Sequence, residues 1–431
     1  MVVTGRFALL ATMAGALVMF AVPSFGGVLG ASSLLLVVLL IDVALVARPN
    51  ALTVTREPLT VVRLGRETEV ELAVTNTGTT AVRGLLWDAW PESARAEYRT
   101  RRLALAPNTR IRFRTRLNPV YRGDRVAGPV TLRLLGPLGM AGRQTRVDAP
   151  ARVRALPAFR SERLLRSKVK RLHHLEGRNV ANTRGQGTEF DSFREYVAGD
   201  DVRSIDWRAT ARATDVLVRT WRPERNRHML MVLDTGRVSA GRVGDGTRLD
   251  CAIEAALLLG GLAGAAGDTV DLLAYDRTVR AEVTGAGGAG LPMKLMHTLA
   301  GVTPQLVDTD TDGLVRTVLA RVRRRALIVW FTSLDGPTVT EHLLPALPTL
   351  TRRHRVLIVS VTDPDIAAAA RDRETADAVY TSAAAETVLA ERAVVRESLR
   401  RRGVAVVTAA PDQLPEALAD EYLELKRSGS L

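Results

Sequence analysis

The segment from Gly185 to Arg212 reads Gly185-Gln186-Gly187-Thr188-Glu189-Phe190, then Phe193-Arg194-Glu195-Tyr196, then Gly199-Asp200-Asp201-Val202-Arg203-Ser204-Ile205-Asp206-Trp207, and ends in Ala211-Arg212. Carboxylates and guanidiniums alternate in it with large apolar side chains. A solvated surface seldom carries so many aromatic residues, and an apolar core seldom carries so many charges. Guanidinium groups grip carboxylates in a planar, bidentate geometry. The segment therefore predicts a rigid, half-buried network of Arg–carboxylate pairs.

After this segment, from His228 onward, apolar runs of strand length alternate with helical patterns. The predicted strands are Met229–Leu233, Val270–Tyr275, Val279–Val283, Ala326–Phe331, Arg355–Val361 and Val404–Val407. The predicted helices are Leu249–Gly264, Leu291–Leu299, Leu314–Val322, one near Glu341–Leu350, one within Glu374–Arg402, and Glu416–Lys426. Such alternation indicates a doubly wound α/β domain whose mostly parallel sheet is covered on both faces. Ligands of such sheets bind at the carboxyl ends of the strands.

Before the segment, residues 52–153 show the period of β-strands. Apolar residues at 70, 72 and 74 alternate with Glu69, Glu71 and Ala73. A later run alternates apolar residues with Arg110, Arg112, Arg114 and Arg116. Short strands punctuated by Gly and Pro predict a β-sandwich of immunoglobulin-like size, with one wet and strongly basic face.

The chain begins with two apolar runs, Phe7–Val22 and Val28–Ala47, separated by a Pro-Ser-Phe-Gly-Gly turn. A membrane span needs about 17–25 residues, so the second run qualifies and the first is slightly short. We expect a helical hairpin. Basic residues flank it on both sides and the turn carries none, so the positive-inside rule places both termini and the globular domains in the cytoplasm. Asp42 is a polar residue in the second run.

Four regions follow from these patterns: a transmembrane hairpin (1–48), a β-sandwich (49–155), a basic linker with the charged segment (156–227), and an α/β domain (228–431). In the linker, residues 161–174 predict an amphipathic helix, and residues 176–184 predict a polar loop. The net charge of the chain is +14. The basic excess lies between the hairpin and the charged segment, which suits a membrane surface. No basic–aromatic ladder typical of nucleic-acid modules occurs, and the single cysteine, Cys251, excludes an intramolecular disulfide.

Candidate site residues include two acids at predicted strand tips, Asp234 and Asp335. A strand-tip acid can bind a divalent cation when hydroxyl ligands follow at alternate positions, but Gly236 and Val238 occupy those positions. Two such carboxylates could still hold Mg²⁺ through water. The alternative is that Asp234 caps the next segment and Asp335 begins a turn. No phosphate-binding loop, nucleophile elbow or zinc-binding helix motif occurs.

The acids Asp200, Asp201 and Asp206 invite comparison with hydrolase carboxylates. Catalytic carboxylates need separated pKa values and access to substrate. Neighbouring arginines would hold these carboxylates ionised and paired, which favours a structural role. Asp206 also stands where it could cap a helix that starts at Trp207. We expect Arg203, Asp206 and Trp207 to act as a clamp between the sandwich and the α/β domain.

The segment resembles a bacterial family catalogued as a domain of unknown function, number 58. The matching residues are Gly185, Gly187, Glu189, Phe190, Arg194, Tyr196, Gly199, Asp200, Asp201, Arg203, Ile205, Asp206, Trp207, Ala211, Arg212 and Glu224. The C-terminal Tyr422-Leu423-Glu424-Leu425-Lys426 is similar to the family's usual ending. The resemblance implies a hairpin in the bacterial plasma membrane, a β-sandwich, and a von Willebrand factor A-like (Rossmann-like) domain.

It also implies partners, namely a MoxR-type AAA+ ATPase and other von Willebrand A-like membrane proteins, in chaperone-like assembly or envelope maintenance. No enzymatic activity is implied. The leading hypothesis is therefore a non-catalytic, membrane-anchored adaptor without a firmly expected cofactor. One alternative is a metal-dependent hydrolase that uses Asp200, Asp201 and Asp206, or Asp234 and Asp335. Another is a sensor of anionic lipids built on the basic sandwich.

Overall fold

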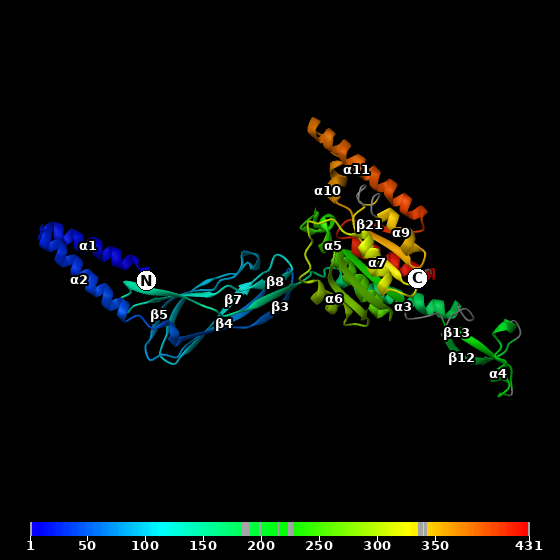
Figure 1. Cartoon of the computed structure of the whole chain (residues 1–431), viewed down its shortest axis with the longest axis horizontal. Helices are drawn as coiled ribbons and strands as arrows, with labels where there is room; N and C mark the ends of the chain where they lie inside the picture. The colour runs from blue at the N-terminus through cyan, green and yellow to red at the C-terminus, as the bar shows by residue number, and fades with distance from the viewer. Residues whose placement is uncertain are drawn as a thin grey trace. The chain divides into compact units, whose positions relative to one another are not determined.

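The computed structural model describes residues 2–182, 189–197, 200–213, 215–222, 227–334, 339 and 343–429. The chain divides into two compact units, Met1–Leu156 and Pro157–Leu431 (Figure 1). Each unit has its own sheets and its own apolar core.

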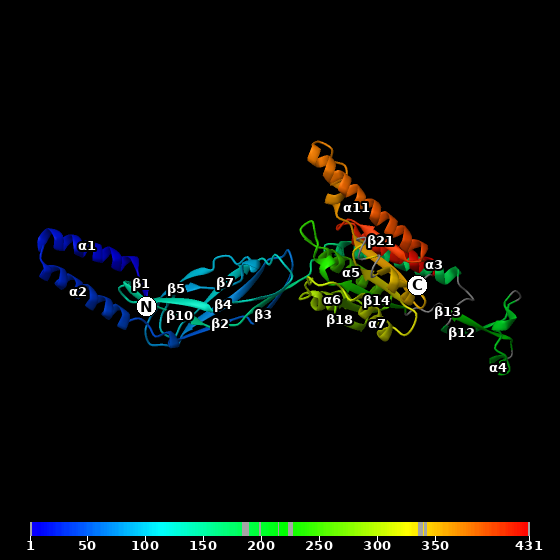
Figure 2. The same cartoon turned by 45° about the horizontal axis from the view of Figure 1, so that its top comes forward.

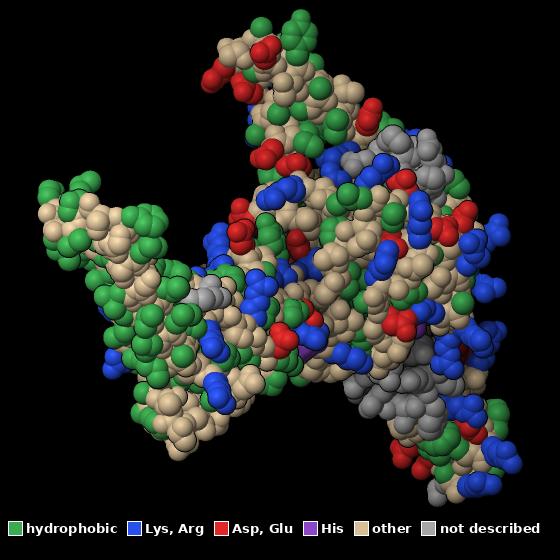
Figure 3. All heavy atoms as spheres, turned by 60° about the vertical axis from the view of Figure 1, so that its left-hand side comes forward, with side chains coloured by type: hydrophobic (Ala, Val, Ile, Leu, Met, Phe, Trp, Pro, Cys, Tyr) green, Lys and Arg blue, Asp and Glu red, His purple; other side chains and the backbone are tan. Residues whose placement is uncertain are grey.

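The first unit begins with two apolar helices, α1 (Gly5–Ala21) and α2 (Phe25–Ala44), which pack on each other as the predicted hairpin. Ser24 caps α2 by accepting a hydrogen bond from the Gly27 amide. One helix, Phe25–Ala51, is long and apolar enough to cross a membrane by length and composition, while α1 is shorter. Large apolar side chains such as Phe20 and Phe25 are exposed on the hairpin, whose surface is mostly hydrophobic (Figure 3).

Asp42, the polar residue of α2, is fully buried at the end of the helix nearest the sandwich. Its carboxylate accepts hydrogen bonds from the amides of Leu138 (2.8 Å), Met140 (2.8 Å) and Ala141 (2.9 Å). These amides lie at the connection between two sandwich strands, β9 (Val130–Leu135) and β10 (Ala141–Val147). Asp42 therefore ties the helical hairpin to the sandwich.

The strands of this unit, β9 and β10 included, form three sheets, of order β1-β10-β9-β5-β6, β2-β4-β7 and β3-β11-β8. The strands not yet given are β1 (Val2–Val3), β2 (Leu52–Arg56), β3 (Leu59–Arg63), β4 (Thr68–Asn76), β5 (Val82–Trp87), β6 (Thr100–Leu105), β7 (Arg110–Leu117), β8 (Gly123–Val126) and β11 (Arg152–Leu156). The first two sheets share one apolar core, to which Leu72 and Val74 of β4 and Leu132 of β9 contribute. The predicted alternation in β4 is confirmed, because its apolar residues are buried.

The predicted basic face of β7 is exposed, but acids of the neighbouring strand β4 lie opposite its arginines. Arg112 lies 3.3 Å from Glu71, and Arg114 and Arg116 lie 3.9 and 3.3 Å from Glu69. Cross-strand pairs of opposite charge stabilise a sheet modestly. The positive charge of this face is therefore partly neutralised. The acids that neutralise it lie in β4, far from β7 in the sequence, and are brought opposite its arginines by strand pairing.

Arg56, which follows the apolar hairpin in the sequence, is part of a buried network in the sandwich. Its guanidinium pairs with Asp88 and donates to the carbonyls of Gly128 (2.8 Å) and Ala149 (2.7 Å). Asp88 also accepts from the Trp90 indole (3.1 Å) and the Thr115 hydroxyl (2.7 Å). The multiple hydrogen bonds offset the cost of burying both charges.

The second unit is built on a six-stranded sheet of order β18-β17-β14-β19-β20-β21 (Figure 2). Its strands are β14 (His228–Asp234), β17 (Thr269–Tyr275), β18 (Val279–Ala286), β19 (Leu327–Phe331), β20 (Arg355–Val361) and β21 (Ala405–Ala409). All neighbours pair in parallel except the antiparallel edge strand β18. The order reverses between β14 and β19, so the predicted doubly wound α/β arrangement is confirmed.

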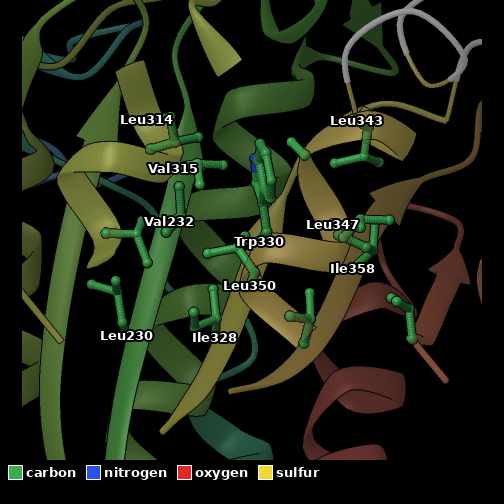
Figure 4. Packing of buried hydrophobic residues seen from close by; sticks show 14 of the residues in the cluster. Leu230, Val232, Leu314, Val315, Ile328, Trp330, Leu343, Leu347, Leu350 and Ile358 are labelled. Atoms are coloured by element: carbon green, nitrogen blue, oxygen red, sulfur yellow. The ribbon is translucent and has the colours of Figure 1, made fainter. Parts of the chain in front are cut away.

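Helices cover both faces of this sheet. The helices are α5 (Arg248–Ala265), α6 (Leu291–Leu299), α7 (Thr311–Arg321), α9 (Leu344–Thr351), α10 (Pro364–Ala369), α11 (Ala376–Arg401) and α12 (Leu414–Arg427). Side chains from α7, α9 and the end of α11 form one core with β14, β19 and β20. In Figure 4, Leu314 and Leu347 lie with Trp330 in this core. On the other face α5 packs on β14, β17 and β20.

Helix α3 (Glu162–Asn182) belongs to the second unit. The prediction of a separate linker at 156–227 is therefore wrong for the residues of this helix. The helix packs on α5 and α12, and its buried Lys168 lies 2.8 Å from Glu416 and 2.9 Å from Asp420. The predicted loop at 176–184 is also wrong up to Asn182, because the helix continues. A single glycine inside a helix costs about 1 kcal/mol and does not by itself end it.

Replacing Asp88 with Ala should lower the stability of the sandwich by about 3–5 kcal/mol, because Arg56 would remain buried without its carboxylate partner. Native-state hydrogen exchange of sandwich amides in the detergent-solubilised chain would measure the loss. The matched control is Glu71→Ala, which removes the exposed cross-strand pair and should cost under about 1 kcal/mol. Equal effects of the two substitutions would contradict the buried-network interpretation.

Candidate functional site

The carboxyl edge of the sheet holds a buried acid, Asp234, at the end of β14. Its Oδ1 accepts hydrogen bonds from the Gly236 amide (2.8 Å) and the Thr309 hydroxyl (2.6 Å). Its Oδ2 accepts from the Thr332 hydroxyl, 2.9 Å away. The Gly236 bond joins Asp234 to the residue that begins the next helical turn, Arg237–Ala240, but that turn has no side-chain cap, so Asp234 does not cap it as the alternative prediction had it. The two threonines were not anticipated.

Burial raises the pKa of the Asp234 carboxyl above its ordinary value, against the opposing effect of its three hydrogen bonds. Other buried acids of this unit have a cation at hand: Asp268 lies 3.0 Å from Lys426, and Asp276 lies 2.6 Å from Arg280. Among the described residues, only neutral donors bond to Asp234. Asp234 therefore carries a desolvation cost that no salt bridge offsets.

Gly236 stands where a hydroxyl residue would be needed for the usual strand-tip cation pattern, and the structure explains its presence. A Cβ atom at this position would lie 2.2 Å from the Thr309 hydroxyl and 2.9 Å from the Val307 carbonyl oxygen. The loop before α7 thus occupies the space of a side chain at 236. The Thr309 hydroxyl, which is distant in sequence, therefore lies next to Asp234 where a side chain at position 236 would otherwise stand.

A small pocket that is open to solvent lies beside Asp234. Arg248, Thr332, Ser333 and Ser239 line its polar side, and residues including Leu249 and Phe331 line its apolar side. Arg248, the first residue of α5, donates from Nη1 to the Ser333 hydroxyl at 2.8 Å. The pocket thus combines a guanidinium, several hydroxyls and an apolar wall, which is typical of a binding site with a few convergent polar groups.

The described residues give little support to the alternative in which Asp234 and Asp335 hold Mg²⁺. Asp234 is the only carboxylate among the pocket-lining residues, and the guanidinium of Arg248 shares the pocket with it. A hard cation prefers several oxygen ligands and is repelled by a nearby positive charge. No cluster of three metal-ligating side chains occurs in the described parts of the chain. The second predicted ligand, Asp335, lies outside the described residues.

Much of the charged segment forms an arm between α3 and β14. The motif arm consists of β12 (Glu189–Glu195), the 3-10 turn η3 (Val202–Ser204), α4 (Trp207–Thr210) and β13 (Leu217–Arg222). Strands β12 and β13 pair antiparallel, and η3 and α4 both contact β13 (Figure 2). Four residues of the predicted motif, Gly185, Gly187, Gly199 and Glu224, lie outside the described residues. The backbone of Glu189 and Phe190 lies in β12.

The acids of the arm are engaged one by one and not as a catalytic group. Asp200 lies 2.7 Å from Arg194 and accepts from the Val197 amide, and the Arg194 bond holds the Asp200 pKa below its ordinary value. Asp201 caps η3 by accepting from the Arg203 amide. Ionised, separately paired carboxylates are poor general acids.

Asp206 has the predicted capping role. Its Oδ1 accepts from the Arg208 and Ala209 amides at 2.9 Å, so it begins α4. Its Oδ2 pairs with Arg219 of β13, not with Arg203. The Ala209 amide bond, followed by the Arg219 bond, lowers the pKa of Asp206. The sequence prediction missed Arg219, because it considered only the charges up to Arg212.

The aromatic residues of the arm are less buried than the predicted half-buried network requires. Trp207 is 69% exposed, and Phe193 and Tyr196 are 44% and 37% exposed. Ile205 is half-buried and forms a bridge with the buried Val218. Among the arm residues whose side chains are described, Val218 is the large apolar residue that is buried, and the clamp between the two units stays a prediction.

The geometry described so far defines a two-unit protein: an apolar helical hairpin with a β-sandwich, and a doubly wound α/β unit that carries the motif arm. Residues 192–369, which span the arm from Ser192 and much of the α/β sheet, match the model of the family described as Protein of unknown function DUF58. The family resemblance seen in the sequence is thereby confirmed.

Similar proteins occur in mycobacteria. Uncharacterized protein Rv1480 of Mycobacterium tuberculosis (strain ATCC 25618 / H37Rv) is 27% identical over 192 residues, which are 44% of this chain and 60% of that protein. Uncharacterized protein Mb1516 of Mycobacterium bovis gives the same values. The chain thus covers about three fifths of the length of these curated relatives.

Solved structures show only remote likeness. The CARDB domain of the PF1109 protein of Pyrococcus furiosus, determined in complex with di-metal ions, is 16% identical with a TM-score of 0.19 and covers 24% of this chain and 91% of its own. WR4, an MSP family member of C. elegans, is 7% identical with a TM-score of 0.19 and covers 24% of this chain and 97% of its own. Likeness at these scores supports no conclusion about fold or ligands.

Asp234→Asn should change how stability depends on pH. The native pKa of Asp234 lies above its unfolded value of about 3.9, so the unfolded chain releases this proton first as the pH rises. The wild type should therefore lose stability relative to Asp234→Asn from about pH 4 upward, until the native carboxyl also ionises. Hydrogen exchange of β14 and β19 amides at several pH values would measure the difference. A pH-independent difference would contradict the desolvation of Asp234.

Asp206→Ala should loosen the arm alone. Loss of the cap should speed exchange of the Arg208 and Ala209 amides by about tenfold, while amides of β14 and β19 keep their protection. Asp206→Asn is the matched control, since Asn caps helices as well as Asp does. Loss of protection in the central sheet as well would show that Asp206 acts beyond the arm, as the clamp hypothesis requires.

Proposed function

We propose that this chain is a non-catalytic, membrane-anchored adaptor whose α/β unit binds a protein partner at the carboxyl edge of its sheet. The unit would act in the manner of a von Willebrand A-like domain, and the family resemblance makes a MoxR-type AAA+ ATPase the expected partner. The α1–α2 hairpin would anchor the chain in the bacterial plasma membrane, with its globular units in the cytoplasm.

One observation carries the proposal: a buried acid without a cation stands where the strand order of the sheet reverses. In open α/β sheets, ligands bind at this point, outside the carboxyl ends of the strands. Asp234 lowers stability by its burial, and residues that cost stability tend to cluster at functional sites. The hydroxyls of Thr309 and Thr332 hold its carboxylate in a fixed position.

The adjoining pocket suits a partner side chain. Arg248 and Ser333 lie on its polar side, joined by a hydrogen bond from the guanidinium to the Ser333 hydroxyl. An apolar wall that includes Leu249 and Phe331 offers burial to a side chain of the partner. A few polar groups set in an apolar wall are typical of a binding pocket.

The hydrolase alternative draws less support from the described residues. Asp200 and Asp206 have pKa values below their ordinary range, since arginines and amides stabilise their charged forms. A hydrolytic pair needs one carboxyl that keeps its proton near neutral pH. Asp234 has a raised pKa but lies alone among the described acids of its pocket.

Crosslinking in native membranes followed by pull-down of the tagged full chain would test the proposal, with and without ATP. Wild type should recover an AAA+ ATPase, and Asp234→Asn should recover severalfold less, because the substitution alters the carboxylate that holds the Thr309 and Thr332 hydroxyls in place at the proposed binding edge. Asp377→Asn, an exposed acid in the first turn of α11, is the control and should bind normally. Recovery of no ATPase by wild type, or equal recovery by Asp234→Asn, would refute it.

A further inference from the structure

The tip of the motif arm, residues 202–213, has an unusual surface that the proposed function does not use. Trp207 is 69% exposed and Val202 is 62% exposed. Arg203, Arg208 and Arg212 are exposed beside them. The only acid in the segment, Asp206, is buried and paired with Arg219. The exposed part of the tip is therefore apolar and positively charged.

The three tip arginines are not neutralised within the described chain. No carboxylate of the described residues lies within 4.0 Å of the guanidinium of Arg203, Arg208 or Arg212. Of the flanking acids, Asp200 pairs with Arg194, whereas Asp201 and Asp215 are exposed, and Asp201 accepts from the Arg203 backbone amide. The three arginines therefore outnumber the two exposed acids that flank the tip. The positive charge of the tip is therefore available to an anionic ligand or surface outside the chain.

The basic face of the sandwich, on β7, differs from the tip of the arm in how its arginines are paired. That face has more arginines, but Glu69 and Glu71 pair with three of them. It also lacks an exposed aromatic residue on β7, where Phe113 is half-buried. The positive charge of the sandwich face is therefore partly neutralised, while the smaller tip has both arginines without a described carboxylate partner and an exposed indole.

We propose that the tip of the motif arm docks on the surface of a bilayer that contains anionic lipids. Indole rings prefer the interface between lipid headgroups and acyl chains, where one edge is apolar and the other is hydrated. Arginines beside the indole bind anionic headgroups, each with about fivefold in the equilibrium constant for surface binding. Trp207 and Val202 enter the interface, and Arg203, Arg208 and Arg212 contact the phosphates.

The arm is built to present these side chains. Asp206 fixes the start of α4 through two amides and ties it to β13 through Arg219. The Ile205–Val218 bridge holds η3 against the same strand. Trp207 follows Asp206 directly, so its backbone is fixed although its side chain is exposed. A rigid presentation reduces the entropy lost when the indole binds.

The full chain reconstituted in nanodiscs tests the proposal without any partner protein. The discs contain phosphatidylcholine alone or phosphatidylcholine mixed with phosphatidylglycerol, with brominated acyl chains as the quencher. The emission of Trp207 is obtained as the difference between wild type and Trp207→Phe, because the chain has five tryptophans. Quenching of Trp207 should occur in the anionic discs and fall severalfold in discs of phosphatidylcholine alone.

Two triple variants separate the tip from general charge. Arg203→Gln/Arg208→Gln/Arg212→Gln should lower the docking equilibrium constant by on the order of 100-fold, whereas Arg110→Gln/Arg112→Gln/Arg114→Gln, which removes the same charge from β7, should leave quenching unchanged. The proposal is overturned by an unquenched Trp207 in anionic discs, by equal quenching in both lipids, or by equal effects of both triple variants. Protection of Trp207 only when an acidic protein is added would assign the tip to a protein partner and would overturn it as well.

Discussion

The second unit depends on the burial of α5. Most of its length is closed off from solvent, with Leu257, Leu258 and Leu262 fully buried. Because β14, β17 and β20 contact one side while α3, α6 and α12 contact others, α5 cannot shift without opening several interfaces. Gly261 permits part of this closeness, since a Cβ there would lie 3.0 Å from Leu165 of α3. A helix held so firmly places its first residue, Arg248, at a fixed point of the pocket beside Asp234.

The sequence predicted the architecture well where periodicity is strong. The strands and helices from β14 to α12 follow from alternating apolar runs, and the strands of the sandwich follow from the period of two around Val70 and Phe113. The prediction erred where tertiary contacts decide the outcome. The helix predicted at 161–174 was assigned to a separate linker and not to the α/β unit, because the contact of Lys168 with acids about 250 residues away leaves no local pattern.

The sequence predicted one residue of the candidate site, Asp234, and did not predict its hydrogen-bond partners Thr309 and Thr332. Asp234 ends an apolar strand, which is a local signal for the carboxyl edge of a sheet. Thr332 follows β19 directly, and a rule that inspects every residue after a parallel strand would have found it. Thr309 comes from a loop without periodicity, and only folding brings its hydroxyl to Asp234. Likewise the linear sequence shows the arginines of β7 and of the arm tip as similar, and only strand pairing shows which of them have acids opposite.

The anchoring of Asp42 has a mechanical consequence for the first unit. Val46, four residues later, packs into the core shared by the sheets β1-β10-β9-β5-β6 and β2-β4-β7, and a short 3-10 turn, η1 (Pro49–Ala51), lies between it and β2. A domain hung on a flexible tether turns freely about its attachment, whereas here the three amides that bind Asp42 and the buried Val46 give two points of fixation. The sandwich should therefore follow any tilt of α2 as one rigid lever.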